Sequence, residues 1–458
     1  MPNKDSTSPA SASGRLRDFG FETRAVHAGV RPDPYTGASA LPIYQTAGFT
    51  FEDPDSAAAY FNLQEYGNIY SRIMNPTVAA FEERIANLEG GAGAVGFASG
   101  LAAQASAFLT LLEPGDHIVS SQAVYGGSVQ QFKNVLGKLS VEVTLVDPDD
   151  LDAWRAAIRP NTKALFAETI GNPGGNILDI ESVALIAHEH GAPLIVDNTF
   201  ATPYLCRPIE WGADIVVHSA TKFICGHGTT IAGVVVDSGT FNWSNGRFPT
   251  VAGPSSAYHG LEFHETFGVY GFLMKLRSEA LRDLGASLSP FSAFLLAQGL
   301  ETLHVRVERH VQNALAVAQF LASHPMVEQV RFAGLPDSPY APLVRKYLPK
   351  GAGSVFSFEL RGGREAGKRL LQALQIWSHI ANVGDTKSLV LHPASTSHRQ
   401  LSEDELRAAG VGPGTIRLSV GLESVDDLIW DLDQALRAAA EDMPTPQTSA
   451  STTAEVTR

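Results

Sequence analysis

The chain is 458 residues long, which exceeds what one small hydrophobic core needs and predicts two domains. Its formal net charge of −14 argues against general binding to nucleic acids or acidic membrane surfaces, and no apolar run is long enough to span a bilayer. Its two cysteines, Cys206 and Cys225, are too few for a disulfide framework and are typical of a reducing cytoplasm, where we expect the protein to reside.

The N-terminal region is predicted to contain a disordered tail followed by an extended arm. Residues 1–18 are rich in Ser, Ala and charged residues, which is typical of disorder. From Phe21 the sequence reads FETRAVHAG and later DPYTGASALPIYQTAGFTF, and we expect an extended segment of the kind that packs on a partner subunit. Asn75 and Pro76 then predict the start of a helix, as its N-cap and first residue.

A glycine-rich segment near residue 95 offers a phosphate-binding turn. Its glycines match G-x-G-x-x-G, but they precede the predicted strand 94–98, whereas a dinucleotide-binding motif must follow a strand. The strand-to-helix turn is instead formed by Ser99, Gly100 and Leu101. Free backbone N–H groups and the helix dipole favour an anion at such a turn, so we expect a phosphate there.

Short apolar segments alternate with helical stretches through the first half of the chain, which predicts a mostly parallel sheet of the α/β class. Segments of this kind, bounded by Gly, Pro, Asn or Asp, are typical of strands buried on both faces. We predict strands at residues 94–98, 118–120, 141–146, 164–167, 194–196, 215–217 and 234–236. Two loops between them carry Tyr125, in V-Y-G-G, and Asn172, in E-T-I-G-N-P.

Polar groups cluster after two neighbouring strands. Asp197 directly follows one strand, and Ser219, Thr221 and Lys222 follow the next. Pyridoxal phosphate needs a lysine amine for its Schiff base, a carboxylate that keeps its ring nitrogen protonated, and small donors for its phosphate. These residues supply all three, so we predict that they bind this cofactor.

The pattern after residue 286 predicts a second, smaller α/β domain. A stripe of apolar residues at helical spacing comes first, and strands are predicted at 355–360 and 416–420. Arg417 lies on the second of these strands, where an unpaired buried charge is costly. Because a guanidinium can hold a carboxylate through two hydrogen bonds, we predict that Arg417 binds a substrate carboxylate; a structural ion pair is the alternative.

Histidine spacing gives no reason to expect a metal ion. His188 and His190 flank Glu189, which is not the H-E-x-x-H arrangement of zinc enzymes. His259 and His264 have no matching acidic or cysteine partners in the sequence. We therefore predict that the protein binds no metal.

The motifs together resemble one known family. The run DNTFATPYLCRPIEWGADIVVHSATKFICGHG, with PIYQTAGFTF, NIYSRIMNPTV, FNW and LVLHPASTSH, is similar to the Cys/Met-metabolism family of pyridoxal-phosphate enzymes, and most similar to its O-acetylhomoserine sulfhydrylase branch. The resemblance extends from about Phe21 to about Leu436. It implies an aminotransferase class I-like fold (fold type I), with a mostly parallel seven-stranded sheet domain and a smaller C-terminal α/β domain.

The resemblance also implies how the chain is divided and assembled. The predicted parts are a disordered tail (1–18), an N-terminal arm and loop (19–70), a cofactor-binding large domain (71–286), a small domain (287–442) and a second disordered tail (443–458). In the family, a Tyr and an Arg matching Tyr70 and Arg72 reach the cofactor phosphate of the other subunit, and this Tyr also contacts the substrate. A homotetramer of two dimers with shared active sites is implied, while the residues alone leave dimer and tetramer open.

Further roles follow from the family motifs. The turn matching Ser99–Leu101 holds the cofactor phosphate. The residue matching Tyr125 stacks on the cofactor ring and helps handle the departing group, and the one matching Asn172 hydrogen-bonds the phenolic oxygen. The resemblance assigns the substrate carboxylate to Arg417, with help from Ser388. Lys222 and Tyr125 are thus the expected catalytic residues.

The branch implies γ-replacement on O-acetyl-L-homoserine by sulfide or methanethiol, giving homocysteine or methionine and acetate. Alternatives are cystathionine γ-synthase or O-succinylhomoserine sulfhydrylase activity, or a methionine or cystathionine lyase. Gly127 disfavours the lyase, because the methionine-degrading branch usually carries cysteine at that position. A non-catalytic cofactor-binding scaffold is opposed by the intact set of Asp197, Lys222 and Arg417. The residues distinguish neither the ester nor the sulfur donor.

Overall fold

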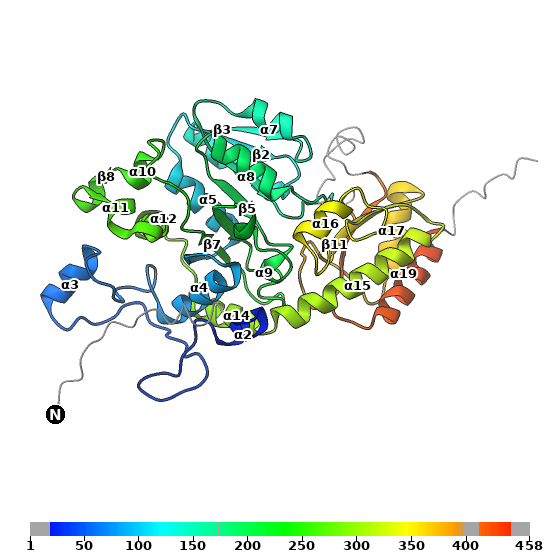
Figure 1. The fold of residues 1–458 in the computed structure, drawn as a ribbon. Coiled ribbons are helices and arrows are strands. Elements are labelled where there is room, and N and C mark those ends of the chain that lie inside the picture. The colour runs from blue at the N-terminus through cyan, green and yellow to red at the C-terminus, as the bar shows by residue number, and fades with distance from the viewer. Residues whose placement is uncertain (1–18, 173, 394–395, 397–411, 441–458) are drawn as a thin grey trace, which may run out of the picture.

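The computed structural model describes residues 19–172, 174–393, 396 and 412–440, which form two domains lying side by side (Figure 1). The larger domain is built on a seven-stranded sheet and the smaller on a five-stranded sheet. The predicted α/β class, with a mostly parallel sheet and a smaller C-terminal domain, is confirmed. None of the helices within the described residues is long and apolar enough to cross a lipid bilayer.

The large sheet has the strand order β1-β7-β6-β5-β4-β2-β3. Strand β7 runs antiparallel to both of its neighbours, and the other pairs are parallel. The strands are β1 (Gly93–Phe97), β2 (His117–Ser121), β3 (Glu142–Val146), β4 (Thr162–Glu168), β5 (Leu194–Asp197), β6 (Ile215–His218) and β7 (Gly233–Asp237). Each strand overlaps one of the predicted apolar segments, so these strand predictions are confirmed.

Alternate residues of the central strands enter separate hydrophobic clusters on the two faces of this sheet. Val196 belongs to a cluster with residues of α4 (Pro76–Glu89) and α8 (Ile180–Glu189), whereas Ile195 belongs to one with residues of α5 (Gly100–Leu111). Because side chains alternate along a strand, helices must cover both faces. Burial on both faces explains why the strands are nearly continuous apolar runs in the sequence.

The other helices of the large domain are mostly short, and several of them connect the strands (Figure 1). A small hairpin lies among them, formed by β8 (Pro254–Ser255) and β9 (Leu261–Glu262). These helices are α2 (Phe21–His27), α3 (Pro54–Phe61), α6 (Gly126–Gln131), α7 (Leu151–Ala157), α9 (Thr202–Leu205), α10 (Pro249–Ala252), α11 (Phe263–Phe267), α12 (Gly271–Lys275) and α13 (Arg282–Leu284).

The N-terminal arm is not extended throughout, so that prediction is wrong in part. Helix α2 buries Phe21, Arg24 and Ala25, and the Arg24 Nη1 donates at 2.8 Å to the carbonyl of Asn87 in the last turn of α4. Helix α3 follows, with Asp53 as its N-cap. The apolar residues of α2 recur at helical spacing. This spacing, rather than the irregular composition of the segment, determines the structure there.

The small domain contains a sheet of order β10-β11-β14-β13-β12, antiparallel except for the β12–β13 pair. Helix α15 runs from the large domain into the small one (Figure 1). The elements are α14 (Pro290–Glu301), α15 (Leu303–Ser323), β10 (Val327–Arg331), α16 (Ala341–Tyr347), β11 (Val355–Leu360), α17 (Gly363–Ala373), β12 (Ser378–His379), β13 (Leu389–Leu391), β14 (Thr415–Ser419) and α19 (Val425–Ala440).

A buried carboxyl group at the end of β7 makes stability depend on pH. Asp237 is fully buried, and its Oδ1 accepts a hydrogen bond from the N–H of Gly239 at 3.1 Å, while its Oδ2 has no partner among the described residues. Burial, with a smaller contribution from the nearby Asp214 carboxyl, raises the pKa of Asp237 to about 7. An aspartate in the unfolded chain loses its proton near pH 4, at about its ordinary pKa.

Between about pH 4 and pH 7 the folded chain therefore binds the Asp237 proton more tightly than the unfolded chain, so stability should fall as the pH rises. Asp237→Asn is neutral at every pH and should lose this contribution. We expect the drop in the urea unfolding midpoint between pH 5 and pH 8 to be smaller in this variant than in the wild type. Asp337→Asn changes an exposed carboxylate and should behave like the wild type. Equal pH dependence in all three proteins would contradict the assignment.

Candidate active site

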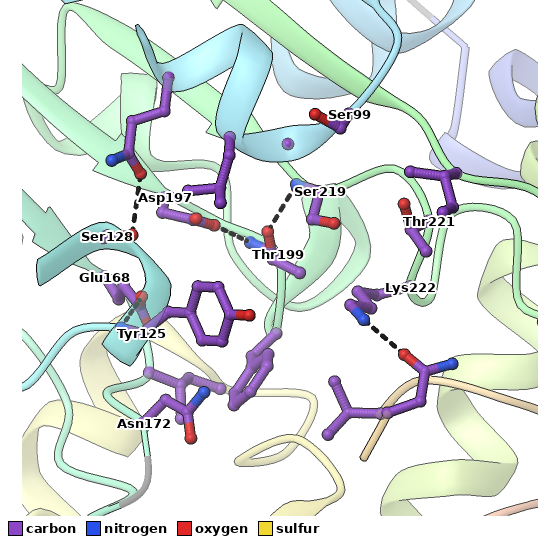
Figure 2. A pocket seen from close by; sticks show the side chains of 18 of the residues that line it. Ser99, Tyr125, Ser128, Glu168, Asn172, Asp197, Thr199, Ser219, Thr221 and Lys222 are labelled. Atoms are coloured by element: carbon purple, nitrogen blue, oxygen red, sulfur yellow. Dashed lines mark hydrogen bonds between the residues drawn. The ribbon is translucent and has the colours of Figure 1, made fainter. Parts of the chain in front are cut away.

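A cavity of about 270 Å³ lies where the carboxyl ends of the parallel strands face the small domain. Figure 2 shows its side chains converging from the large domain and from the segment before β13. Most of the predicted site residues line it: Ser99, Gly100, Leu101, Tyr125, Asn172, Asp197, Ser219, Thr221, Lys222 and Arg417. The sequence therefore found most of the cavity wall before the fold was known.

Asp197 is the buried acid of the cavity. It ends β5, and one of its carboxylate oxygens accepts a hydrogen bond from the backbone N–H of Thr199 at 2.9 Å. Burial raises the pKa of Asp197, while the hydrogen bonds of Thr199 and the nearby His218 partly oppose this shift. Among the described residues it forms no ion pair, so a cationic group of a ligand is its natural partner.

Lys222 presents its amine to the same cavity from the turn that follows β6. Since β5 and β6 are parallel neighbours, with Asp197 opposite Val217, the lysine turn begins close to the acid. The Lys222 Nζ donates a hydrogen bond to the Oδ1 of Asn382. Burial, and then the positive charge of Arg417, lower the pKa of Lys222, which increases the share of neutral, nucleophilic amine.

Two turns meet at the end of the cavity suited to a phosphate. Ser99 is the N-cap of α5, and its Oγ accepts a hydrogen bond from the N–H of Ala102 at 3.1 Å. A Cβ on Gly100 would lie 2.7 Å from the Cβ of Ser219, so a larger residue there would force the two turns apart. The Thr221 hydroxyl lines the cavity but is bonded to the backbone of Ala232. Helix N–H groups and hydroxyls in this arrangement favour an anion.

The ring of Tyr125 faces the cavity from the N-terminus of α6 (Figure 2). About half of this side chain is exposed, at 51%. Its backbone N–H donates to the Oε1 of Glu168 at 2.6 Å. Asn172 lies across the cavity from the strand ends, and its amide is directed to the same space. Both residues are thus available to a planar ligand held between Asp197 and Lys222.

Arg417 brings a positive charge from the small domain. It lies on β14, paired with Ser357 of β11 and Leu391 of β13. Its side chain is half-buried, and burial lowers the pKa of its guanidinium. The structural ion pair that was its alternative explanation is not found among the described residues. A ligand carboxylate would satisfy this cation.

Three predicted residues do not reach the cavity in this chain. Ser388 is fully buried, and its Oγ donates to Glu423 at 2.8 Å, so its hydroxyl is committed to a structural contact and its expected role at the substrate carboxylate is not supported. Tyr70 forms a backbone bridge with Gly48, and the guanidinium of Arg72 packs 5.4 Å from the centre of its ring. A role for this pair at an active site requires a second subunit.

Sequence reasoning missed several cavity residues, of which three carry clear contacts. Asn382 binds the lysine amine, Thr199 donates to Asp197, and Glu168 accepts from the Tyr125 N–H. Glu168 had a usable signal, because it ends an apolar strand as Asp197 does. Asn382 lies in N-V-G-D, a loop in which no spacing points to a lysine far away in the chain. No group of three or more His, Cys, Asp or Glu side chains within the described ranges could hold a metal.

The donor set fits pyridoxal phosphate. One cavity holds a lysine amine of lowered pKa, a buried carboxylate that has no cationic partner in the described part of the chain, and the close turn at Gly100. The cofactor needs a nucleophilic amine at its carbonyl carbon, an anion at its ring nitrogen and N–H donors at its phosphate. Each need has a matching group of this chain.

Comparisons with known proteins agree with this fit. The family model described as Cys/Met metabolism PLP-dependent enzyme matches residues 22–437. The O-acetyl-L-homoserine sulfhydrylase of Leptospira meyeri is 47% identical over 93% of this chain and 99% of its own length. That of Corynebacterium glutamicum is 48% identical over 94% and 100%. The homocysteine synthase of Schizosaccharomyces pombe is 49% identical over 92% and 98%.

A solved structure gives the same answer for the fold. It comes from Campylobacter jejuni, is assigned as an O-acetylhomoserine (thiol)-lyase and carries a pyridoxyl-lysine monophosphate. It superimposes with a TM-score of 0.88 at 43% identity, over 92% of this chain and all of its own. The chain therefore belongs to the Cys/Met metabolism family of pyridoxal-phosphate-dependent enzymes.

Proposed function

We propose that the protein catalyses a γ-replacement on O-acetyl-L-homoserine, in which sulfide or methanethiol displaces acetate and yields L-homocysteine or L-methionine. Relatives that are 47–48% identical over most of the chain are named as sulfhydrylases of this ester. The observation that carries the proposal is one cavity lined by Lys222, Asp197 and Arg417. An amine, an acid and a carboxylate-binding cation are the minimum needed to activate an amino acid.

The residues of the cavity have distinct parts in holding the cofactor. Pyridoxal phosphate, when bound, supplies an electrophilic carbonyl carbon and a ring that accepts electron density from the substrate. The Lys222 amine is the group that would bind that carbon, and the Asp197 carboxylate would balance positive charge on the ring nitrogen. The α5 N-terminus at Ser99 and Gly100, with Ser219, would hold the phosphate.

Lys222 is also the group that moves protons. When the substrate amine takes its place, the neutral Lys222 amine can take the proton from the substrate Cα, and its lowered pKa increases the share of this base form. Loss of a second proton, from Cβ, lets acetate leave from Cγ. The thiol then adds at Cγ, and return of both protons gives the new amino acid.

Arg417 sets the orientation of the substrate. Its guanidinium can bind the α-carboxylate through two parallel hydrogen bonds, which leaves the side chain of the ester directed toward Tyr125. Asn382, now bonded to the Lys222 amine, is released for the substrate when that amine moves. Holding the reacting groups in place makes a bimolecular step effectively unimolecular, and this supplies much of the rate enhancement.

The proposed assembly is a homotetramer of two dimers in the cytoplasm, with each active site completed by the partner subunit. Tyr70 and Arg72 lie outside the cavity of their own chain, next to the N-terminal arm. That arm exposes large apolar side chains, among them Phe61 at 58% and Tyr66 at 80%. Exposed aromatic residues on one segment favour burial against another protein surface.

Product analysis tests the reaction. With O-acetylhomoserine and sulfide, the holoenzyme should form homocysteine and acetate in equal amounts, with little 2-oxobutyrate or ammonia. Replacing the ester by O-succinylhomoserine should lower kcat/KM, and replacing sulfide by methanethiol should give methionine. Accumulation of 2-oxobutyrate and ammonia without a thiol product would reject the transferase in favour of a lyase.

Substitution of the two central groups tests their roles. Asp197→Asn removes the buried negative charge, and kcat should fall on the order of a hundredfold or more, as when one preorganised electrostatic contact is lost. Lys222→Ala should be inactive and, unlike the wild type, should retain no cofactor after borohydride reduction and denaturation. Asp214→Asn changes a buried carboxyl that precedes β6 and lies outside the cavity, and it should keep the kcat of the folded fraction. Wild-type activity in Asp197→Asn would refute the assignment.

Mixed oligomers test the shared site. Chains carrying Arg72→Ala and chains carrying Lys222→Ala should each be nearly inactive alone. After the two are unfolded and refolded together, hybrid dimers contain one site with both residues intact, so part of the activity should return. Lack of recovery in hybrids that mass spectrometry shows to have formed would mean that each subunit works alone.

A further inference from the structure

A second carboxyl group, Glu168, lies beside Asp197 in the cavity. Glu168 ends β4 and Asp197 ends β5, and the two residues are direct partners in the parallel register of these strands. Residues in the same register of a parallel pair point to the same face of a sheet. Both side chains line the cavity, and Glu168 is 7% exposed. The chemistry proposed above needs one acid at this place and gives the second no task.

The contact that Glu168 makes is to the turn that carries Tyr125. Its Oε1 accepts the Tyr125 N–H at 2.6 Å, which links the end of β4 to the start of α6. The Ser128 hydroxyl also anchors α6, by donating to Gln104 at 3.0 Å, but Tyr125 itself offers no side-chain cap to this short helix and is followed by two glycines. The Tyr125 ring lies directly over Gly127, where a Cβ would be 2.2 Å from its Cε1. The position of the Tyr125 ring thus depends on the hydrogen bond between its backbone N–H and Glu168.

The neighbouring Asp197 carboxyl disfavours a second carboxylate at Glu168. Asp197 is the direct strand partner of Glu168, whereas Lys222, Arg417 and the Tyr125 phenol line other parts of the same cavity wall. Burial first, and then the charge of Asp197, raise the pKa of Glu168 well above its usual range, and the Tyr125 N–H offsets this only in part. Two adjacent buried carboxyls share one negative charge at lowest cost when one keeps its proton.

We propose that Glu168 is a positioning residue that acts as a neutral carboxylic acid: it fixes the Tyr125 turn through its Oε1 and leaves Asp197 as the charged partner of the cofactor. The inference rests on the roles proposed above for Tyr125 and Asp197. Glutamine has the same shape, keeps an oxygen for the Tyr125 N–H and is uncharged. Glutamine therefore mimics the neutral form of Glu168. Alanine removes the acceptor oxygen, and the shorter side chain of aspartate places it too far from the Tyr125 N–H.

The test compares Glu168→Gln, Glu168→Ala and Glu168→Asp as holoenzymes. Glu168→Gln should keep kcat within about threefold of the wild type and an unchanged pH profile of kcat/KM, because no charge is lost. Glu168→Ala should lower kcat about tenfold or more, as for loss of one fixing hydrogen bond, with a smaller change in the KM for the ester. Glu168→Asp keeps a carboxyl group and should resemble Glu168→Ala, which makes the test independent of whether the alanine variant folds.

The affinity of each apoprotein for pyridoxal phosphate and the visible circular dichroism of the bound cofactor give readouts without turnover. Glu168→Ala and Glu168→Asp should alter the dichroism, which reports groups packed on the cofactor, whereas Glu168→Gln should not. This signal survives even if the proposed reaction is wrong, so the two ideas fail separately. Glu359→Gln and Glu359→Ala are matched controls, because Glu359 accepts the N–H of Gly414 at 2.9 Å in the small domain, and both should behave like the wild type.

Two outcomes would overturn the proposal. If Glu168→Gln loses as much kcat as Glu168→Ala, or loses the acidic limb of the pH profile, the negative charge of Glu168 is required. If Glu168→Ala and Glu168→Asp keep wild-type kcat and dichroism, Glu168 does not position Tyr125. The proposal is supported if Glu168→Ala and Glu168→Asp lose kcat and alter the dichroism while Glu168→Gln keeps both.

Discussion

The structure depends on a buried aspartate that no cationic side chain of the described residues neutralises. Asp197 is held at the end of β5 by the sheet and by the Thr199 N–H, and the described residues give it no ion pair. A buried carboxylate of this kind costs stability until a cation arrives. Under the proposed function, the protonated ring nitrogen of pyridoxal phosphate would supply that cation and offset the cost when the cofactor binds. The parallel pairing of β5 with β6 then sets the distance to Lys222.

Other charges in the cavity follow from this first one. Burial, and then repulsion from Arg417, lowers the pKa of the Lys222 amine, while burial, and then the Asp197 charge, raises the pKa of Glu168. The cavity thus brings together an amine and a guanidinium of lowered pKa, Lys222 and Arg417, and two carboxyl groups of raised pKa, Asp197 and Glu168. An amino-acid substrate brings a carboxylate and an amine. Arg417 can bind the carboxylate, and the cofactor site can accept the amine. The arrangement explains why a protein of net charge −14 can hold anionic groups here.

What the sequence predicted follows the physics of the backbone. Strands buried on both faces are apolar runs, and residues at their carboxyl ends share one edge, so Asp197, Lys222 and Ser99 could be placed together without coordinates. The hydrogen-bond partners of individual side chains were not predictable in the same way. Ser388 is a plausible substrate ligand until Glu423 is seen to bind its hydroxyl. Helix α2 lies in an arm of mixed composition, which obscured its helical spacing. The contact of Asn382 with Lys222 joins residues far apart in the sequence, and no local spacing predicts it.

The Lys222 turn shows how the two domains act as one site. Arg306, on the α15 helix that leads into the small domain, donates to the carbonyl of Phe223 at 2.8 Å and to that of Gly299 at 2.6 Å. Burial lowers the pKa of Arg306 to about 10, so it remains charged at neutral pH. A Cβ on Gly226 would lie 2.0 Å from its Nη1, which requires glycine where the turn closes on the guanidinium. The α15 helix, which leads into the small domain that carries Arg417, therefore also holds the turn that carries the Lys222 amine.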